Sequence, residues 1–262
     1  MALVHIGFFS EALGMCTSCE VILPQPSRSL IGMETHKDDE KPAKVLWLLH
    51  GASDDETIWQ RRTSIERYVA PLNMAVVMPA AQLSSYSDMA HGQKFFTYIA
   101  DELPRIMCRF FRFSGKREDN FIAGLSMGGG GCLKIGLSRP QSYAAIGCLS
   151  AGIFDVKRMA AGNPHFAKMM ERVIGDRAIE GTAEDPKGAA RKLVEAGGPF
   201  PRVFHAWGTS DFVKDTAEDT RAFFQSFQNN PFDYTFEEDE GAHTWEYWDE
   251  HIQHFLKYIE EK

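Results

Sequence analysis

The sequence predicts an α/β fold in which helices cover both faces of a mostly parallel central sheet. Short apolar runs such as 45–51 and 74–79 are typical of strands that are buried on both faces of a parallel sheet. Amphipathic segments with helical spacing alternate with such runs. The chain has 262 residues, 44% of them hydrophobic, which is enough to bury one large core. We therefore expect a single domain over residues 1–262.

The first half of the chain opens with two strands joined around Gly14 and a charged loop. The segment 54–70 has acidic residues in its first turn and apolar residues at helical spacing, and Pro71 stops it. A second helix is interrupted at Pro104. In order, we expect strands at 3–9 and 17–24, a loop at 36–44, a strand at 45–51, a helix at 54–70, a strand at 74–79, a helix at 95–111 and a strand at 120–126.

The second half continues the alternation, with one longer excursion. We expect a helix at 127–139, strands at 143–151 and 202–208, a helix at 216–228, a strand at 233–238 and an amphipathic helix at 243–261. The segment 152–199 is either a small cap-like insertion or a set of connecting helices. Its larger apolar side chains either line a substrate pocket or belong to the core; they are Phe154, Met159, Phe166, Met169 and Met170.

Composition excludes several classes of protein. The net charge of -8 and the isoelectric point near 5.6 argue against binding nucleic acid or an anionic membrane surface. The sequence contains no apolar stretch long enough for a membrane span. Five cysteines, an odd number, favour reduced thiols, and the Cys16 and Cys19 pair has no second pair at zinc spacing. A cytoplasmic protein without a metal or cofactor is the expectation.

The stretch "FIAGLSMGGGG", residues 121–131, points to catalysis. It contains G-x-S-x-G, in which a serine occupies a tight turn between a strand and a helix. Gly124 and Gly128 meet the need for tiny residues two positions before and after Ser126. The first amides of the helix lack intrahelical partners, so the Met127 amide can donate to an oxyanion. The second donor is predicted to be the amide of Ala52, after the strand that ends "LLHG".

A serine nucleophile needs a base and an acid, which follow it in the order serine, acid, histidine in this type of site. His243 is predicted as the base because it lies in a loop, "DEGAHTW", between a strand and the last helix. Asp211 is predicted as the acid because it follows a buried strand by a short turn. His251 and His254 have a spacing that resembles a metal pair, but a solvated helix face is the expected explanation for both. The glycine-rich stretch matches no phosphate-binding pattern.

These motifs resemble the tributyrin esterase group of α/β-hydrolases, which is related to esterase D and S-formylglutathione hydrolase. The stretches that carry the resemblance run through nearly the whole chain: "FFSEALGM", "VILPQ", "LLHGASDDETIWQRRTSIERY", "VVMP", "FIAGLSMGG", "GTSDF" and "GAHTWEYWD". The resemblance implies an α/β-hydrolase fold, a triad of Ser126, Asp211 and His243, and oxyanion amides from Ala52 and Met127. Members are typically intracellular, metal-independent esterases for short acyl chains, and several are homo-oligomers.

The predicted function is a serine carboxylesterase that acts on a small-molecule acyl ester through an acyl-enzyme. Gly51, Trp59 and Tyr86 are further candidates for contact with the substrate. Relatives often carry a tryptophan before the tyrosine, where this chain has Ser85, which leaves the size of the substrate open. S-formylglutathione, or an acetyl or feruloyl group on a carbohydrate, is an alternative substrate. The rival class is a non-catalytic binding protein on the same scaffold, which would be expected to lack a triad member.

Overall fold

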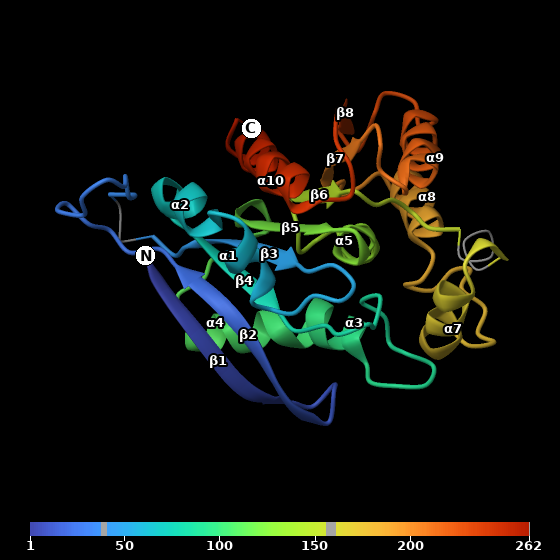
Figure 1. Cartoon of the computed structure of the whole chain (residues 1–262), viewed down its shortest axis with the longest axis horizontal. Coiled ribbons are helices and arrows are strands. Elements are labelled where there is room, and N and C mark those ends of the chain that lie inside the picture. Colours follow the sequence, from blue (N-terminus) through green and yellow to red (C-terminus); the bar gives the residue numbers. More distant parts are fainter. Residues whose placement is uncertain (38–40, 156–160, 262) are drawn as a thin grey trace.

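Eight strands form one sheet in the order β1-β2-β4-β3-β5-β6-β7-β8 in the computed structural model, which describes residues 1–37, 41–155 and 161–261 (Figure 1). The strands span Ala2–Ser10 (β1), Met15–Leu23 (β2), Lys44–Leu49 (β3), Met74–Pro79 (β4), Asn120–Leu125 (β5), Ala145–Leu149 (β6), Arg202–Gly208 (β7) and Thr235–Asp239 (β8). β2 runs antiparallel to β1 and β4, and the remaining neighbours are parallel. The predicted fold class is confirmed.

Helices cover both faces of this sheet. They span Ile58–Arg62 (α1), Ile65–Val69 (α2), Ala70–Leu72 (η1), Phe95–Thr97 (α3), Tyr98–Glu102 (η2, a π-helical turn), Leu103–Phe110 (α4), Arg117–Asp119 (η3), Met127–Ser138 (α5), Pro164–Val173 (α7), Pro186–Ala196 (α8), Lys214–Gln225 (α9) and Trp245–Glu260 (α10). One core cluster joins α1, α2 and α10 to one face, and another joins α4, α5, α8 and α9 to the opposite face. No helix in the described ranges has the length and apolarity that a bilayer crossing requires.

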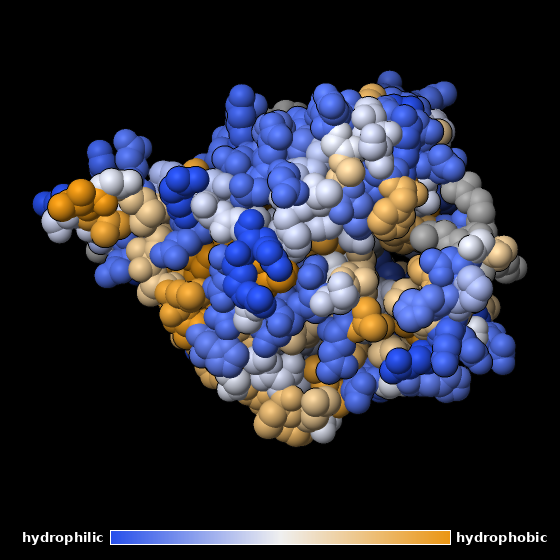
Figure 2. Space-filling model, viewed as in Figure 1, coloured by the Kyte–Doolittle hydropathy of each residue, from blue (hydrophilic) through white to orange (hydrophobic). Residues whose placement is uncertain are grey.

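The two cores explain why the central strands are continuous apolar runs. In β5, the side chains of Phe121, Ala123 and Leu125 pack into the core under α10, and Ile122 packs into the opposite core. Successive side chains of a strand point to opposite faces, so a strand covered on both sides must be apolar at every position. β1, at the edge of the sheet, instead exposes Leu3 and Phe9, and orange surface lies over this part of the molecule in Figure 2.

The helix expected at 54–70 is wrong as one continuous element, because it breaks between α1 and α2. The hydroxyl of Thr63 donates to the carbonyl of Trp59 at 2.6 Å and accepts from the amide of Ile65 at 3.2 Å. The Ser64 amide donates to Asp249 of α10 at 3.4 Å. These bonds satisfy backbone and side-chain groups outside a helical ladder, and such competition is a known weakness of Ser and Thr in helices. The expected interruption at Pro104 is confirmed, with a π-helical turn before it.

The segment 152–199 contains α7 and α8. α8 packs Ala190 and Leu193 into the main core. Phe154 packs against that core as well, and α7 builds a small separate cluster whose members include Phe166, Met169 and Met170. Met159, the remaining candidate for a pocket wall, lies outside the described residues. The described members of the set therefore have core contacts.

Candidate active site

Ser126 stands on the sharp turn between β5 and α5. Its φ of 51° and ψ of -117° lie in a region that few residues with a side chain adopt. The turn requires glycine on both sides. A Cβ on Gly124 would come within 2.6 Å of the carbonyl carbon of Gly128, and a Cβ on Gly128 would come within 2.5 Å of the carbonyl oxygen of Leu49. The strained turn thus places the Ser126 side chain at the end of β5, at the edge of the sheet.

Three side chains that are distant in sequence form a chain of hydrogen bonds. The Nε2 atom of His243 lies 2.9 Å from the Oγ atom of Ser126. Its Nδ1 atom lies 2.9 and 3.1 Å from the two carboxylate oxygens of Asp211. A carboxylate only accepts, so Nδ1 carries the hydrogen and Nε2 is left to accept the serine proton. Ser126 follows β5, Asp211 follows β7, and His243 lies in the loop between β8 and α10.

Asp211 is built to remain charged. Burial alone would raise its pKa, but hydrogen bonds from His243 and from the Val213 amide, together with the nearby Ser150 hydroxyl, hold the pKa below the usual value. The Val213 amide donates to Oδ1 at 3.0 Å, and the carboxylate side chain is fully buried. An ionised carboxylate in this position stabilises a positive charge on the imidazole next to it.

Two aromatic side chains fix the imidazole of His243 from the sides. The centroid of the Phe212 ring lies 4.2 Å from that of the imidazole. The Trp248 ring meets the imidazole edge to face, with 4.9 Å between the ring centroids. Sequence reasoning missed both residues. The available signal was the presence of an aromatic residue directly after Asp211 and of three aromatics in "TWEYW" after His243.

The serine and the histidine open onto a cleft of about 450 Å³. Its walls are formed by the loop that follows β3 (residues 50–57, called the β3 loop below), by charged side chains and by the start of α10. The lining residues are Gly51, Ala52, Ser53, Asp54, Arg62, Leu125, Ser126, His243, Thr244, Trp245, Glu246 and Trp248. Of the predicted substrate contacts, Gly51 therefore lies in the cleft. The predicted oxyanion residue Ala52 lies there too, while Met127 begins α5 directly after Ser126.

His50, which sequence reasoning did not consider, controls the backbone of the β3 loop. Its Nε2 atom accepts the amide hydrogen of Ala81 at 3.0 Å, so its Nδ1 atom carries the hydrogen and donates to the Gly51 carbonyl at 2.7 Å. Burial lowers the pKa of His50 and keeps the ring neutral. In a trans peptide, the carbonyl of Gly51 and the amide of Ala52 point in opposite directions. Holding the carbonyl against His50 therefore turns the Ala52 amide away from the His50 ring.

Tyr86 and Trp59 do not occupy the substrate positions that we predicted. Both side chains are fully buried and neither lines the cleft. The hydroxyl of Tyr86 donates to the carbonyl of His50 at 2.9 Å, and the indole of Trp59 donates to the carbonyl of Leu49 at 3.0 Å. The two residues thus hold the end of β3 from opposite faces of the sheet. The correction has a simple cause, since their polar atoms find buried carbonyls and their rings fill the space beside the strand.

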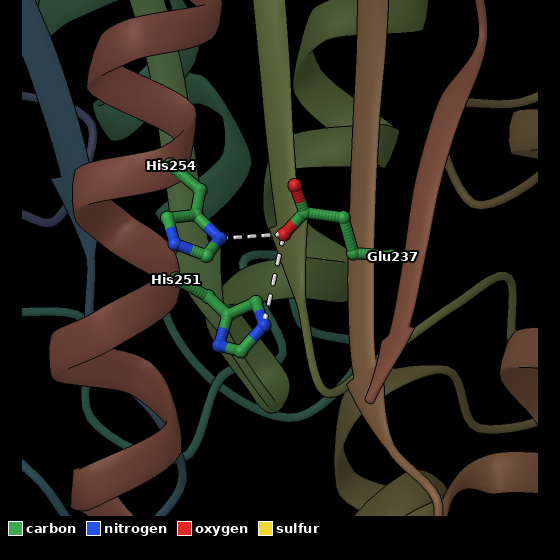
Figure 3. Close-up of side chains that lie close together, drawn as sticks. All are labelled: Glu237, His251 and His254. Atoms are coloured by element: carbon green, nitrogen blue, oxygen red, sulfur yellow. Dashed lines mark hydrogen bonds and ion pairs between the residues drawn. The ribbon is translucent and has the colours of Figure 1, made fainter. Parts of the chain in front are cut away.

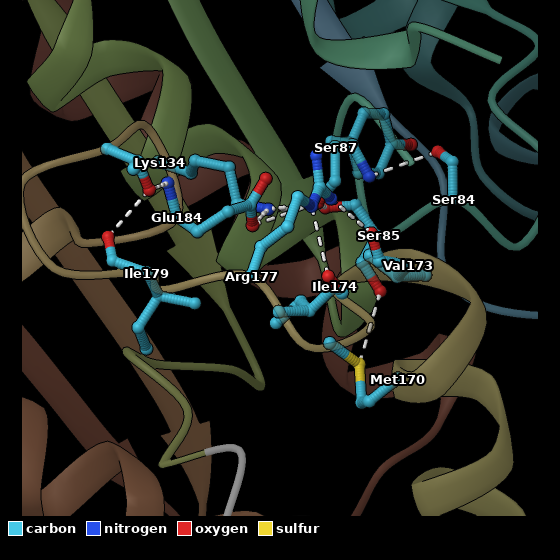
Figure 4. A network of polar contacts seen from close by, with 12 residues as sticks. Ser84, Ser85, Ser87, Lys134, Met170, Val173, Ile174, Arg177, Ile179 and Glu184 are labelled. Carbon is cyan, nitrogen blue, oxygen red and sulfur yellow. Dashed lines mark hydrogen bonds and ion pairs between the residues drawn. The ribbon is translucent and has the colours of Figure 1, made fainter. Parts of the chain in front are cut away.

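A buried lysine supports the turn that carries Tyr86. Ser85 and Tyr86 have φ values of 51° and 54°, which side chains disfavour. The ammonium of Lys134 donates to the Ser85 carbonyl at 2.9 Å and to Ser87 and Glu184 at 2.5 Å each (Figure 4). Burial lowers the pKa of Lys134, and the charge of Glu184 counteracts that shift. The network ties the strained turn to α5 and to the segment before α8.

The fold and the serine at its strand-turn-helix junction define an α/β-hydrolase. Over residues 10–259 the chain matches the family described as putative esterase, and it belongs to that family. It is 30% identical to an acetyl esterase of Caldicellulosiruptor saccharolyticus, with 99% of this chain and 98% of the relative covered. The resemblance to this group of esterases is confirmed.

Solved structures agree with this assignment. The fluorophosphonate-binding serine hydrolase F of Staphylococcus aureus is 34% identical, with a TM-score of 0.85 and 98% of each chain covered. An S-formylglutathione hydrolase from the same organism is 33% identical, with a TM-score of 0.80 and the same coverage. A ferulic acid esterase is 25% identical, with a TM-score of 0.72 and 98% and 96% of the chains covered. The chain is therefore a carboxylic ester hydrolase of the serine esterase type.

Proposed function

We propose that the chain hydrolyses short-chain acyl esters with Ser126 as the nucleophile, His243 as the general base and Asp211 as the group that orients the imidazole. The observation that supports these roles best is the pair of contacts on His243, 2.9 Å to the serine hydroxyl and 2.9 Å to the carboxylate. Distances of this length permit proton transfer without rearrangement. The presence of a serine, a histidine and an aspartate in contact also argues against the alternative hypothesis that the chain is a non-catalytic binding protein.

The reaction follows from these positions. His243 takes the hydroxyl proton as Ser126 attacks the ester carbonyl, and the oxygen that becomes negative receives hydrogen bonds from the amides of Ala52 and Met127. The protonated imidazole then gives its proton to the departing alcohol, which leaves an acyl-enzyme. A water molecule, deprotonated by the same imidazole, attacks the acyl group and releases the acid. Each step needs only the groups that surround Ser126.

The substrate class that we propose is a small, uncharged ester such as an acetyl ester. Trp245 and Trp248 line the cleft, and bulky rings beside the nucleophile limit the size of the group that can enter. The similarity to an acetyl esterase over almost the whole chain supports this choice. The five free thiols among the described residues fit a reducing, cytoplasmic setting.

S-formylglutathione is the second candidate substrate, and one observation favours it. Arg62 brings a positive charge to the cleft, and a guanidinium could pair with a carboxylate of glutathione. The 33% identity to an S-formylglutathione hydrolase supports the same reading. The Arg62→Gln variant separates the two candidates, because removing the charge should raise KM for the glutathione thioester and leave KM for an acetyl ester unchanged.

The test of the catalytic roles is hydrolysis of p-nitrophenyl acetate by Ser126→Ala, with Ser210→Ala as the matched control on an exposed serine. Ser126→Ala should lose at least about 10⁴-fold in kcat, a loss typical of removing a serine nucleophile. The same variant should no longer react with a fluorophosphonate probe, and its thermal midpoint should stay at the wild-type value. Retained turnover or retained labelling in a folded Ser126→Ala protein would place the nucleophile elsewhere.

A further inference from the structure

A second group of chemically active side chains lies away from the cleft, between α10 and the edge strand β8. His251 and His254 are three residues apart on α10 and share one face of the helix. Glu237 and Asp239 are two residues apart on β8 and share one face of the strand. Figure 3 shows the side chains of Glu237, His251 and His254 pointing toward one another. The fold thus brings together the helical pair and a carboxylate that sequence spacing could not connect.

The spacing of the donor atoms suits a metal ion. The Nδ1 atom of His254 lies 2.7 Å from Oε2 of Glu237, and the Nε2 atom of His251 lies 3.6 Å from the same oxygen. One ligand atom from each of the three residues lies within 4.8 Å of the others. Two ligands of a tetrahedral zinc ion are about 3.4 Å apart, given metal-ligand distances of about 2.0–2.1 Å. Small side-chain rotations would therefore bring the three atoms into a coordination sphere.

The hydrogen bonds of His251 orient its metal-binding nitrogen. Its Nδ1 atom lies 2.8 Å from the carbonyl oxygen of Tyr247, which can only accept, so Nδ1 carries the hydrogen. The Nε2 atom of His251 faces a carboxylate oxygen of Glu237 at 3.6 Å and one of Asp239 at 3.1 Å. A histidine with one nitrogen bound to a backbone carbonyl is also the usual arrangement of a metal ligand.

We propose that Glu237, His251 and His254 bind one divalent transition-metal ion of the zinc class. Two imidazoles and one carboxylate are a mixed nitrogen and oxygen set, which suits zinc, cobalt or nickel better than magnesium or calcium. None of the three ligands lines the cleft at Ser126, so the ion would take no part in ester hydrolysis there. His251 is only 2% exposed, which corrects the expectation that both histidines cover a solvated helix face.

The position of the site gives the ion a mechanical role. Its ligands lie on the two elements that flank the loop at 240–244, and that loop carries His243. A bound ion would tie Glu237 in the middle of β8 to His251 and His254 of α10. The ion would therefore stabilise the β8 and α10 pair and reduce the motion of the loop between them.

The test is a titration of chelator-treated protein with Co²⁺, followed by the visible absorption that tetrahedral cobalt shows. We expect saturation at one equivalent and a rise in thermal midpoint with Zn²⁺. Glu237→Gln and His254→Ala should each weaken the metal affinity at least about 10-fold, the lower end of the loss expected for altering a metal site. Both side chains are partly exposed, so these variants should fold, and their thermal midpoints in chelator provide the check.

Two control variants locate the binding. His165→Ala changes an exposed histidine on α7 and should bind cobalt as the wild type does. His243→Ala removes the imidazole of the cleft and should also leave the spectrum unchanged. Absence of a cobalt spectrum in the wild type would overturn the proposal. So would a spectrum that persists in Glu237→Gln and His254→Ala, or one that disappears in His243→Ala.

Discussion

The control of the β3 loop by His50 leads to a prediction that separates stability from catalysis. Asparagine and glutamine each reproduce one nitrogen of histidine, because the Asn amide occupies the place of Nδ1 and the Gln amide that of Nε2. His50→Asn keeps a donor for the Gly51 carbonyl and loses the acceptor for the Ala81 amide. His50→Gln keeps the acceptor for Ala81 and loses the donor for Gly51. Each variant therefore removes one of the two hydrogen bonds that the His50 ring makes.

The magnitudes follow from what each variant leaves unpaired. In His50→Asn the Ala81 amide stays buried without an acceptor, which costs about 1–3 kcal/mol of unfolding free energy. In His50→Gln the Gly51 carbonyl keeps only the long hydrogen bond from the Asp54 amide, at 3.4 Å, so the peptide that carries the Ala52 amide is held less firmly. Complete loss of one oxyanion donor costs about 10²–10³ in kcat. We expect His50→Gln to lose at least about 10-fold in kcat and His50→Asn to stay within about threefold of the wild type.

The assay combines urea unfolding with steady-state hydrolysis of p-nitrophenyl acetate, so that kcat, KM and the free energy of unfolding are measured on the same proteins. In the proposed mechanism the Ala52 amide binds the oxyanion of the transition state, so the loss in His50→Gln should be in kcat with little change in KM. Equal kcat values for His50→Gln and the wild type would refute the reasoning. A loss of kcat in both variants that tracks their loss of stability would refute it as well.

Further substitutions test the other supports of the site. Burial lowers the pKa of His50. The free energy of unfolding that the neutral ring contributes is therefore present above the unfolded pKa of 6.5 and is lost as the pH falls. In urea unfolding below pH 6.5, the free energy of unfolding should decline less steeply with falling pH for His50→Gln than for the wild type. Asp211→Asn should lower kcat about 10⁴-fold and leave the thermal midpoint near that of the wild type, as measured by ester hydrolysis and thermal unfolding. Gly128→Ala forces a Cβ against a β3 carbonyl at 2.5 Å and should cost about 1–3 kcal/mol in chemical denaturation, whereas Gly115→Ala, with open space around it, should be neutral. Lys134→Met leaves the Glu184 carboxylate without its ammonium partner, with the Ser87 hydroxyl as a remaining donor, and should cost about 3 kcal/mol in the same assay.

Local sequence was sufficient to predict the structure of segments whose conformation depends on their own residues. The strand, turn and helix around Ser126 were readable because Gly124 and Gly128 permit a reversal that side chains would block. The apolar runs predicted the buried strands because both faces of the sheet are covered. The positions of Asp211 and His243 after strands were readable for the same reason, since the ends of parallel strands meet at one edge of a sheet.

The sequence did not reveal which distant groups would share a hydrogen bond. The break between α1 and α2 depends on Thr63 and on a contact with Asp249, which is 185 positions away from Ser64. Tyr86 could be read as a pocket wall because nothing near it in sequence indicates that its hydroxyl reaches the His50 carbonyl.

By itself, the amino-acid order determined the alternation of strands and helices, the strained serine turn and the types of residue that complete it. Only the tertiary structure decided that His50 orients the β3 loop and that Glu237 meets His251 and His254. The physical reason is that backbone preference and periodicity act over a few residues. Side-chain hydrogen bonds and clusters of ligands instead depend on distances that exist only after the sheet has assembled.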